Sequence, residues 1–247
     1  MIHFILSNHR TPRIFLLMQS TLLVLSRTCV PLFYYIKTNW FCFCSFIIIL
    51  NMSSNNERVF VVGASGGIGT DVVRGLINKK ITTTAYVRDE EKAKNLFKDE
   101  LLTGYLTLAV GTYTTIDVFT KVIQGHTRLF MVVVGDRNKP VSMWQIKGTL
   151  GKIAFEQGVR QIVDLSSFGV RIRGKQGIIG YMHTSAEEKL WALAEEDPEQ
   201  RSLVVLRPAA FMSNHLMIDA RNIKRSNKIV SCAPPSSTMP WIDTKGT

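Results

Sequence analysis

Four glycines fall within seven residues in the stretch Gly63-Ala64-Ser65-Gly66-Gly67-Ile68-Gly69. The β-branched and aromatic residues 59–62 before it predict a buried strand, and apolar residues at helical spacing within 70–79 predict a helix after it. Glycines at such a turn let the backbone bend sharply, approach a phosphate and pack the helix on the strand. Free N–H groups at the helix start attract phosphate oxygens. The stretch therefore predicts a dinucleotide site rather than a turn without a ligand.

The spacing of these glycines can be interpreted in two ways. Positions 63, 66 and 69 give G-x-x-G-x-x-G, and positions 63, 67 and 69 give G-x-x-x-G-x-G. Neither is the common G-x-G-x-x-G fingerprint, because Ala64 stands at its second position. The sequence leaves open which glycine the pyrophosphate approaches.

Arg88 and Asp89 follow the next expected strand, at 82–87. An acid about 20 residues after the glycines binds the ribose 2′-hydroxyl of NAD, whereas an arginine there suits the 2′-phosphate of NADP. Asp89 also fits the N-cap of a helix that begins with Glu90 and Glu91. That role would free Arg88 for a phosphate, so NADP is favoured over NAD; the alternative is that Arg88 is a solvated surface charge.

The elements that must position these residues alternate along the chain. Strands are expected at 59–62, 82–87, 105–110, 129–134, 160–165 and 203–206, and helices at 70–79, 89–97, 116–124, 140–157 and 186–195. This alternation predicts an α/β fold with a doubly wound parallel sheet, the Rossmann arrangement. The carboxyl ends of the strands then share one edge, where ligands bind. The residues expected on that edge are Gly63, Arg88, Gly135, Ser166 and Pro208.

Six ordered segments add a resemblance. They are "VGASGGIG", "YVRDEEKA", "VDLSSFGV", "HTSAEEKL", "LRPAAFMSN" and "WIDT", and through them residues 59–243 resemble the NmrA-like branch of the atypical short-chain dehydrogenase/reductase superfamily. The resemblance implies a Rossmann domain that binds NADP(H), with NAD possible, and a small C-terminal substrate lobe. It implies cofactor contacts at Gly63, Ser65, Gly66, Gly67, Ile68, Gly69, Arg88, Val134, Gly135, Ser166, Pro208 and Phe211.

Two departures concern binding. The family usually has an aspartate after the third strand that touches adenine, whereas this chain has Gly111-Thr112-Tyr113, so a weaker contact at Thr112 is expected. The "WID" segment normally leads into further elements, but the chain ends at Thr247. The substrate lobe is therefore expected to be incomplete.

A third departure concerns catalysis. In the superfamily mechanism a tyrosine transfers the proton, a lysine lowers the pKa of that tyrosine, and a serine positions the carbonyl. Ser166 or Ser167 can supply the serine and Tyr181 the tyrosine, but Ser185 stands where the lysine of Tyr-x-x-x-Lys would be. Arg173 or Lys175 could reach over in its place. His183, with an ordinary pKa, is a second candidate proton donor, or else a residue at a helix start bonded to the backbone.

The first 51 residues differ from the rest. They contain no Asp or Glu, and hold two apolar runs, 14–25 and 40–50. Each run is shorter than the roughly 20 residues of a membrane-spanning helix. Met52 stands just before the first expected strand. We expect residues 52–247 to be the NAD(P)-binding domain, and 1–51 to be either a misassigned start, giving a cytoplasmic protein, or a membrane anchor.

The composition narrows the partners. The net charge is +11, but no basic stripe with interleaved aromatics accompanies it, so no nucleic-acid partner is expected. Three of the four cysteines lie before residue 52, and the five histidines show no metal-ligand spacing, so no metal is expected. The expected partners are a nicotinamide dinucleotide and a small substrate or a regulatory protein. The two functions left open are an NAD(P)H-dependent oxidoreductase and a non-catalytic NADP(H) redox sensor.

Overall fold

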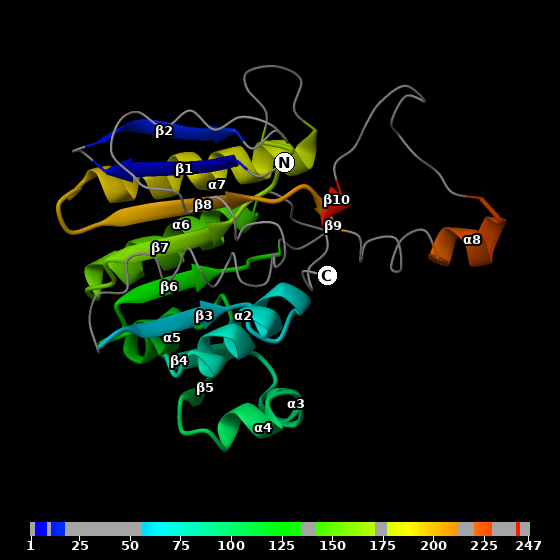
Figure 1. Ribbon diagram of the computed structural model, residues 1–247, viewed down its shortest axis with the longest axis horizontal. Coiled ribbons are helices and arrows are strands. Elements are labelled where there is room, and N and C mark those ends of the chain that lie inside the picture. Colours follow the sequence, from blue (N-terminus) through cyan, green and yellow to red (C-terminus); the bar gives the residue numbers. More distant parts are fainter. Residues whose placement is uncertain are drawn as a thin grey trace, which may run out of the picture.

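The computed structural model describes residues 3–8, 11–17, 56–134, 142–170, 177–211, 220–228 and 241–242. Six parallel strands form the central sheet in the order β8-β7-β6-β3-β4-β5 (Figure 1). The strands are β3 (Arg58–Val62), β4 (Thr82–Val87), β5 (Leu106–Val110), β6 (Arg128–Met131), β7 (Gln161–Leu165) and β8 (Ser202–Arg207). In chain order this is the 3-2-1-4-5-6 arrangement of a Rossmann sheet. The predicted fold class is confirmed.

Two further strands extend the sheet beyond β8. β1 (His3–Asn8) pairs antiparallel with β8, and β2 (Thr11–Leu17) pairs antiparallel with β1. Because both pairings are antiparallel, the sheet is mixed at this end. No strand was expected there from the sequence. Only residues 14–17 of the first apolar run belong to a described element; the remainder of that run and the second run lie outside the described residues.

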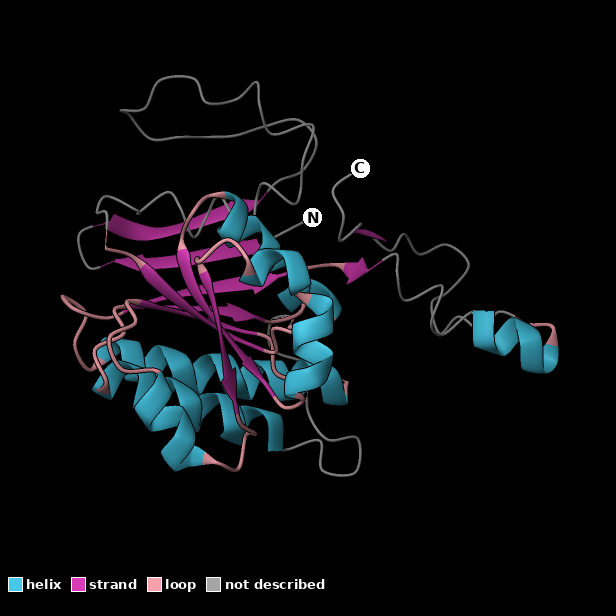
Figure 2. Ribbon diagram, turned by 90° about the horizontal axis from the view of Figure 1, so that it is seen from below, coloured by secondary structure: helices cyan, strands magenta, loops and turns pink. Residues whose placement is uncertain are grey.

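The helices cover both faces of the sheet (Figure 2). On one face α2 (Gly67–Asn78) packs over Val59 and Val61, next to α3 (Glu90–Leu96) and α4 (Lys98–Leu101). On the other face α5 (Ile116–Val122), α6 (Ser142–Glu156) and α7 (Ile178–Glu195) pack over Phe60 and Val62. This alternation along β3 buries both of its faces, as its apolar run predicts. Among the described helices, none is both long and apolar enough to cross a membrane.

The C-terminal part supplies a short helix and a small sheet. β9 (Ala210–Phe211) pairs in parallel with β10 (Trp241–Ile242), and α8 (Ala220–Ser226) is drawn apart from the main sheet in Figure 1. The pairing brings two of the six resemblance segments, "LRPAAFMSN" and "WIDT", side by side.

The helix expected at 186–195 begins eight residues earlier, at Ile178 after Gly177. Gly180 and the β-branched residues of its first turns lower helix propensity, which hid this start in the sequence. Tertiary packing overrides that preference, because Gly148 and Gly151 of α6 leave room for Lys189 and Leu190 of α7. Tyr181 and His183 therefore lie within α7, and His183 does not open the helix.

Candidate functional site

The turn after β3 is built so that Gly63 cannot be replaced. Its φ is +77°, which side chains rarely adopt, and a Cβ would lie 2.2 Å from the carbonyl oxygen of Val132. The turn is closed by Gly66 N, which donates to Gly63 O at 3.1 Å, and by Thr70 Oγ1, which donates to Ala64 O at 3.2 Å. The end of β3 is held against the residues that follow β6 by Val132 N, which donates to Val62 O at 3.0 Å.

The other three glycines of the turn differ in the space around them, and a Cβ on Gly66 would lie 3.3 Å from Gly63 O. A Cβ on Gly69 would lie 2.1 Å from Gly63 O, so this glycine allows α2 to pack against the strand. A Cβ on Gly67 would meet nothing within 4 Å, and Gly67 is exposed. The structure therefore favours the spacing 63, 67 and 69, in which Gly63 turns, Gly69 packs and Gly67 leaves open space where a ligand can approach the backbone.

The start of α2 can attract an anion. Gly66 is its N-cap, no side chain caps this end, and the first turn contains no acid. The partly exposed Ser65 and Ile68 flank the same turn. No carboxylate within the first turn therefore competes for its N–H groups, and the helix dipole adds positive potential. Such a turn can hold the pyrophosphate of a dinucleotide.

Arg88 and Asp89 have separate environments at the end of β4. Asp89 is the N-cap of α3, and its carboxylate accepts a hydrogen bond from Lys92 N at 2.9 Å. Arg88 is exposed and forms no ion pair with any carboxylate in the described part of the chain. Burial raises the pKa of Tyr113 and the nearby charge of Arg88 opposes that rise, so the two residues are neighbours. The capping role expected for Asp89 is confirmed, and the guanidinium of Arg88 is available to a ligand.

Ser166, at the end of β7, belongs to a buried polar cluster. Its hydroxyl donates to Glu187 of α7, which is also paired with Arg207 at the end of β8; Arg207 Nε donates to Glu187 Oε1 at 3.0 Å. Ser166 and Glu187 are both buried. The hydroxyl of Ser166 is thus occupied by the protein, whereas Ser167 next to it is partly exposed. Sequence reasoning missed Glu187 and Arg207, although Arg207 closes an apolar strand.

A second buried pair was also missed by sequence reasoning. Lys147 Nζ lies 2.8 Å from Asp164 Oδ1, and donates to Asp164 Oδ2 at 2.9 Å and to Leu165 O at 2.8 Å. Both side chains are 0% exposed. The available signal was Lys147 on the apolar face of α6, between Met143 and Leu150, and a lone acid within the apolar β7.

His183 differs from the expectation of an ordinary pKa. Burial, and after it the charge of Lys147, lowers the pKa of His183 to about 3. Its Nδ1 is buried and has no hydrogen-bond partner among the described residues. His183 is therefore neutral at physiological pH and cannot serve as an imidazolium proton donor.

The remaining candidates are spread along the carboxyl edge. Tyr181 is 51% exposed on the first turns of α7, and Val134, after β6, is 76% exposed. Pro208 is buried and its carbonyl accepts a hydrogen bond from Phe168 N at 2.8 Å, while Phe211 lies partly exposed in β9. The predictions for Gly135, Arg173 and Lys175 fall outside the described residues.

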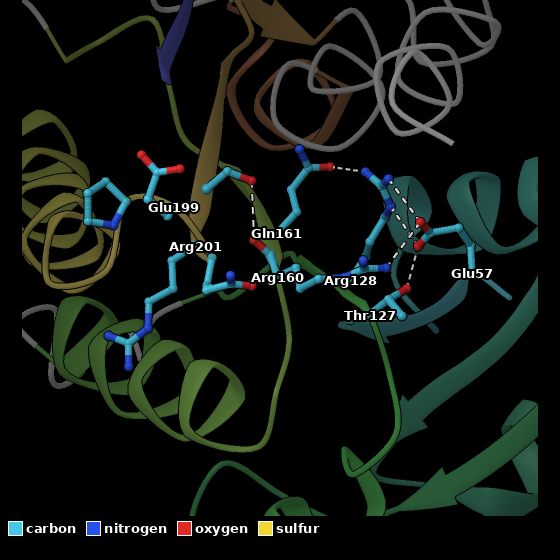
Figure 3. Close-up of a pocket in the computed structure, with 10 residues that line it drawn as sticks. Glu57, Thr127, Arg128, Arg160, Gln161, Glu199 and Arg201 are labelled. Carbon is cyan, nitrogen blue, oxygen red and sulfur yellow. Dashed lines mark hydrogen bonds and ion pairs between the residues drawn. The ribbon is translucent and has the colours of Figure 1, made fainter. Parts of the chain in front are cut away.

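A cavity of about 320 Å³ lies at the opposite, amino-terminal edge of the sheet (Figure 3). Two of the arginines that line it are paired with carboxylates: Arg128 Nε donates to Glu57 Oε2 at 3.0 Å, and Arg201 Nη1 donates to Glu196 at 2.8 Å. Burial raises the pKa of Glu57, but the hydrogen bonds from Arg128 and Thr127 outweigh it and lower that pKa. The pairs that Arg128 makes with Glu57 and Gln161 tie the starts of β3, β6 and β7 together.

Comparisons with known proteins support a dinucleotide site at the glycine turn. Residues 63–217 match the family described as NAD(P)H-binding. No curated protein matches the chain. Pen from Bacillus thuringiensis is similar in structure, with 16% identity and a TM-score of 0.64 over 78% of this chain and 63% of that chain.

Two structures that hold a cofactor are also similar. Citrobacter sp. triphenylmethane reductase complexed with NADP(H) has 18% identity and a TM-score of 0.53 over 67% of this chain and 55% of its own. The NADPH-dependent quinone oxidoreductase QOR2 from Escherichia coli has the same identity and TM-score, over 67% and 54%. This chain thus spans less than two thirds of these three structures. Because the matched segment begins at Gly63 and covers most of the chain, this protein belongs to the NAD(P)H-binding family.

Proposed function

We propose that the protein is an NADP(H)-preferring oxidoreductase of the NmrA-like type, acting in the cytoplasm on a small substrate. The observation that carries the proposal is the open space over Gly67, at the start of an uncapped helix on the carboxyl edge of the sheet. Gly63 and Gly69 shape the turn for packing reasons, whereas no described atom lies close enough to require a glycine at 67. A pyrophosphate lying against the backbone supplies that requirement.

The preference for NADP(H) rests on Arg88. Asp89, the acid directly after Arg88, is used as a helix cap. Arg88 is exposed next to it, and a guanidinium can bind a phosphate through two parallel hydrogen bonds. We therefore assign Arg88 to the 2′-phosphate.

The bound nicotinamide would supply the hydride. The chain would hold the pyrophosphate at residues 65–69 and support the strand ends through the Ser166–Glu187–Arg207 cluster. Of the three residues proposed for catalysis, only Tyr181 combines a dissociable proton with an exposed position on this edge. Tyr181 is therefore the proton donor in this proposal, and neutral His183 is restricted to hydrogen bonding.

The redox sensor is the second candidate function. Two observations favour it: the hydroxyl of Ser166 is taken by Glu187, and Lys147 is bound to Asp164 rather than to Tyr181. A reductase without a serine and a lysine at the reacting carbonyl lacks two groups that normally lower the barrier. The two candidates share the cofactor site. The reductase would turn over a small substrate, whereas the sensor would act through a regulatory protein.

The experiment is a set of NADPH and NADH titrations on the full chain and on Arg88→Ala, followed by turnover with quinones and aldehydes. Arg88→Ala should weaken NADPH binding about tenfold or more and leave NADH binding nearly unchanged. Lys152→Ala removes the same charge from an exposed position on α6 and should change neither affinity. Steady NADPH consumption that Tyr181→Phe abolishes supports the reductase, whereas tight binding without turnover on any substrate supports the sensor.

A further inference from the structure

The loop Gly111–Thr115 lies beside Arg88, at the adjoining ends of β4 and β5. Gly111 N donates to Val87 O at 2.9 Å, and the hydroxyl of Tyr86 donates to Thr112 O at 3.0 Å. A Cβ on Gly111 would lie 2.1 Å from the Tyr86 hydroxyl oxygen, so this glycine is what lets the two strand ends close together. With the pyrophosphate at the first turn and the ribose at the end of β4, the purine base extends toward this loop.

The polar side chains of the loop are all hydroxyls. Residues 111–115 read Gly-Thr-Tyr-Thr-Thr, without a carboxylate, an amide or a cation. The backbone N–H groups of Thr112 and Thr114 are already used, by Thr115 Oγ1 at 2.7 Å and by Thr112 Oγ1 at 3.3 Å. A threonine side chain of this loop that meets a base edge therefore presents a hydroxyl rather than a fixed donor or acceptor.

These hydroxyls can reverse their direction. Thr112 Oγ1 and Thr114 Oγ1 lie 2.8 Å apart, and either oxygen can be the donor. A hydroxyl carries one rotatable proton and two lone pairs, so it can face a partner as donor or as acceptor. Adenine presents an amino donor at its 6-position, whereas a 6-oxopurine presents an acceptor there. A carboxylate at this place would accept only, and would select the 6-amino group.

We infer that the site does not discriminate between 6-amino and 6-oxo purines in its dinucleotide, because the Thr112–Thr114 hydroxyl pair can meet either edge. The inference rests on the proposed function, since it needs the dinucleotide to occupy this edge. It assigns to Thr112 the contact with the 6-position of the base, where a hydroxyl accepts both purines and a carboxylate would select the 6-amino group. The expected ligands therefore include dinucleotides whose base is hypoxanthine as well as NADPH.

The test compares NADPH with reduced nicotinamide hypoxanthine dinucleotide phosphate, by equilibrium titration of the full chain. The two ligands differ only at the purine, so the ratio of their dissociation constants isolates the base contact. For the unmodified chain this ratio should lie within about threefold of one. A preference for NADPH of about tenfold or more would overturn the inference. Failure of both ligands to bind the folded chain would instead overturn the proposed function.

A pair of isosteric variants tests the assignment to Thr112. Thr112→Asp places a fixed acceptor there and should raise the preference for NADPH to about tenfold or more, because an oxo group would face a carboxylate without a proton. Thr112→Asn is the matched control, since its amide can turn to offer either group, and its ratio should stay within about threefold of one. Using the ratio cancels any effect of the new charge on the 2′-phosphate. A ratio that does not change in Thr112→Asp would contradict the role of Thr112.

Discussion

Lys147 and Asp164 form an ion pair without solvent exposure, with Nζ 2.8 Å from Oδ1. The pair joins α6 to β7, directly before the residues that reach the carboxyl edge. Burial raises the pKa of Asp164, and Lys147 opposes that rise. A buried charge is strongly destabilising unless it is paired with an opposite charge. The pair therefore fixes the position of α6 on the sheet.

Removal of one partner should therefore destabilise the protein more than removal of both. Lys147→Met leaves a carboxylate buried without a cation and should lower the free energy of unfolding by about 3–5 kcal/mol. The double variant Lys147→Met/Asp164→Leu should recover most of that loss. Urea unfolding of the three proteins measures this, with Lys152→Met, an exposed lysine on the same helix, as the control. A double variant as unstable as the single one would contradict the account.

His183 predicts a pH dependence of stability. Its pKa is about 3 in the folded protein against 6.5 as the ordinary value, so between these pH values the unfolded chain binds more protons than the folded one. Stability should thus rise with pH through that window and fall as the pH is lowered through it. His183→Gln should reduce the slope of the free energy of unfolding against pH, by an amount equal to at most about one bound proton.

Unfolding midpoints measured from pH 4 to pH 8 would show this effect. His126 also has a lowered pKa, caused mainly by burial, but it is present in both proteins and does not affect the difference. Equal slopes for the two proteins would show that folding does not lower the pKa of His183.

Gly67 and Gly69 predict opposite results for the same change. Gly69→Ala places a Cβ 2.1 Å from Gly63 O and should lower the unfolding temperature. Gly67→Ala meets nothing within 4 Å, so the protein should remain as stable, while NADPH binding weakens about tenfold or more because the Cβ occupies the pyrophosphate position. Thermal unfolding and NADPH titration on both variants separate the two effects. Unweakened binding in Gly67→Ala would remove the main support for the pyrophosphate position.

Asp89 predicts a change in stability without a change in cofactor choice. Asp89→Ala removes the hydrogen bond to Lys92 N and should cost about 1 kcal/mol. Asp89→Ser keeps a capping oxygen and should cost much less. NADH affinity should be the same in all three proteins. Weaker NADH binding in Asp89→Ala would mean that the carboxylate contacts the ribose 2′-hydroxyl.

Local patterns were enough to predict the six parallel strands and the glycine turn. The alternation of apolar strands and amphipathic helices specifies a parallel sheet, and the glycines lie where a strand gives way to a helix. The capping role of Asp89 was likewise predictable, because the cap and the acids after it are adjacent in sequence.

The parts that were not predicted depend on distant contacts. Lys147 meets Asp164 and Glu187 meets Arg207 only after the sheet has formed, so the sequence can show a charge in an apolar element but not which partner it meets. The early start of α7 depends on glycines in α6, and β1 depends on the edge of β8. The lowered pKa of His183 follows from the same packing, which the sequence alone could not show.

The central claim is that the turn at Gly63–Gly69 binds a nicotinamide dinucleotide. A calorimetric titration of the full chain with NADPH tests this claim most directly. The account predicts saturable binding of one NADPH per chain, tighter than NADH by about tenfold or more. Absence of saturable binding to a chain whose circular dichroism shows it to be folded would contradict the account.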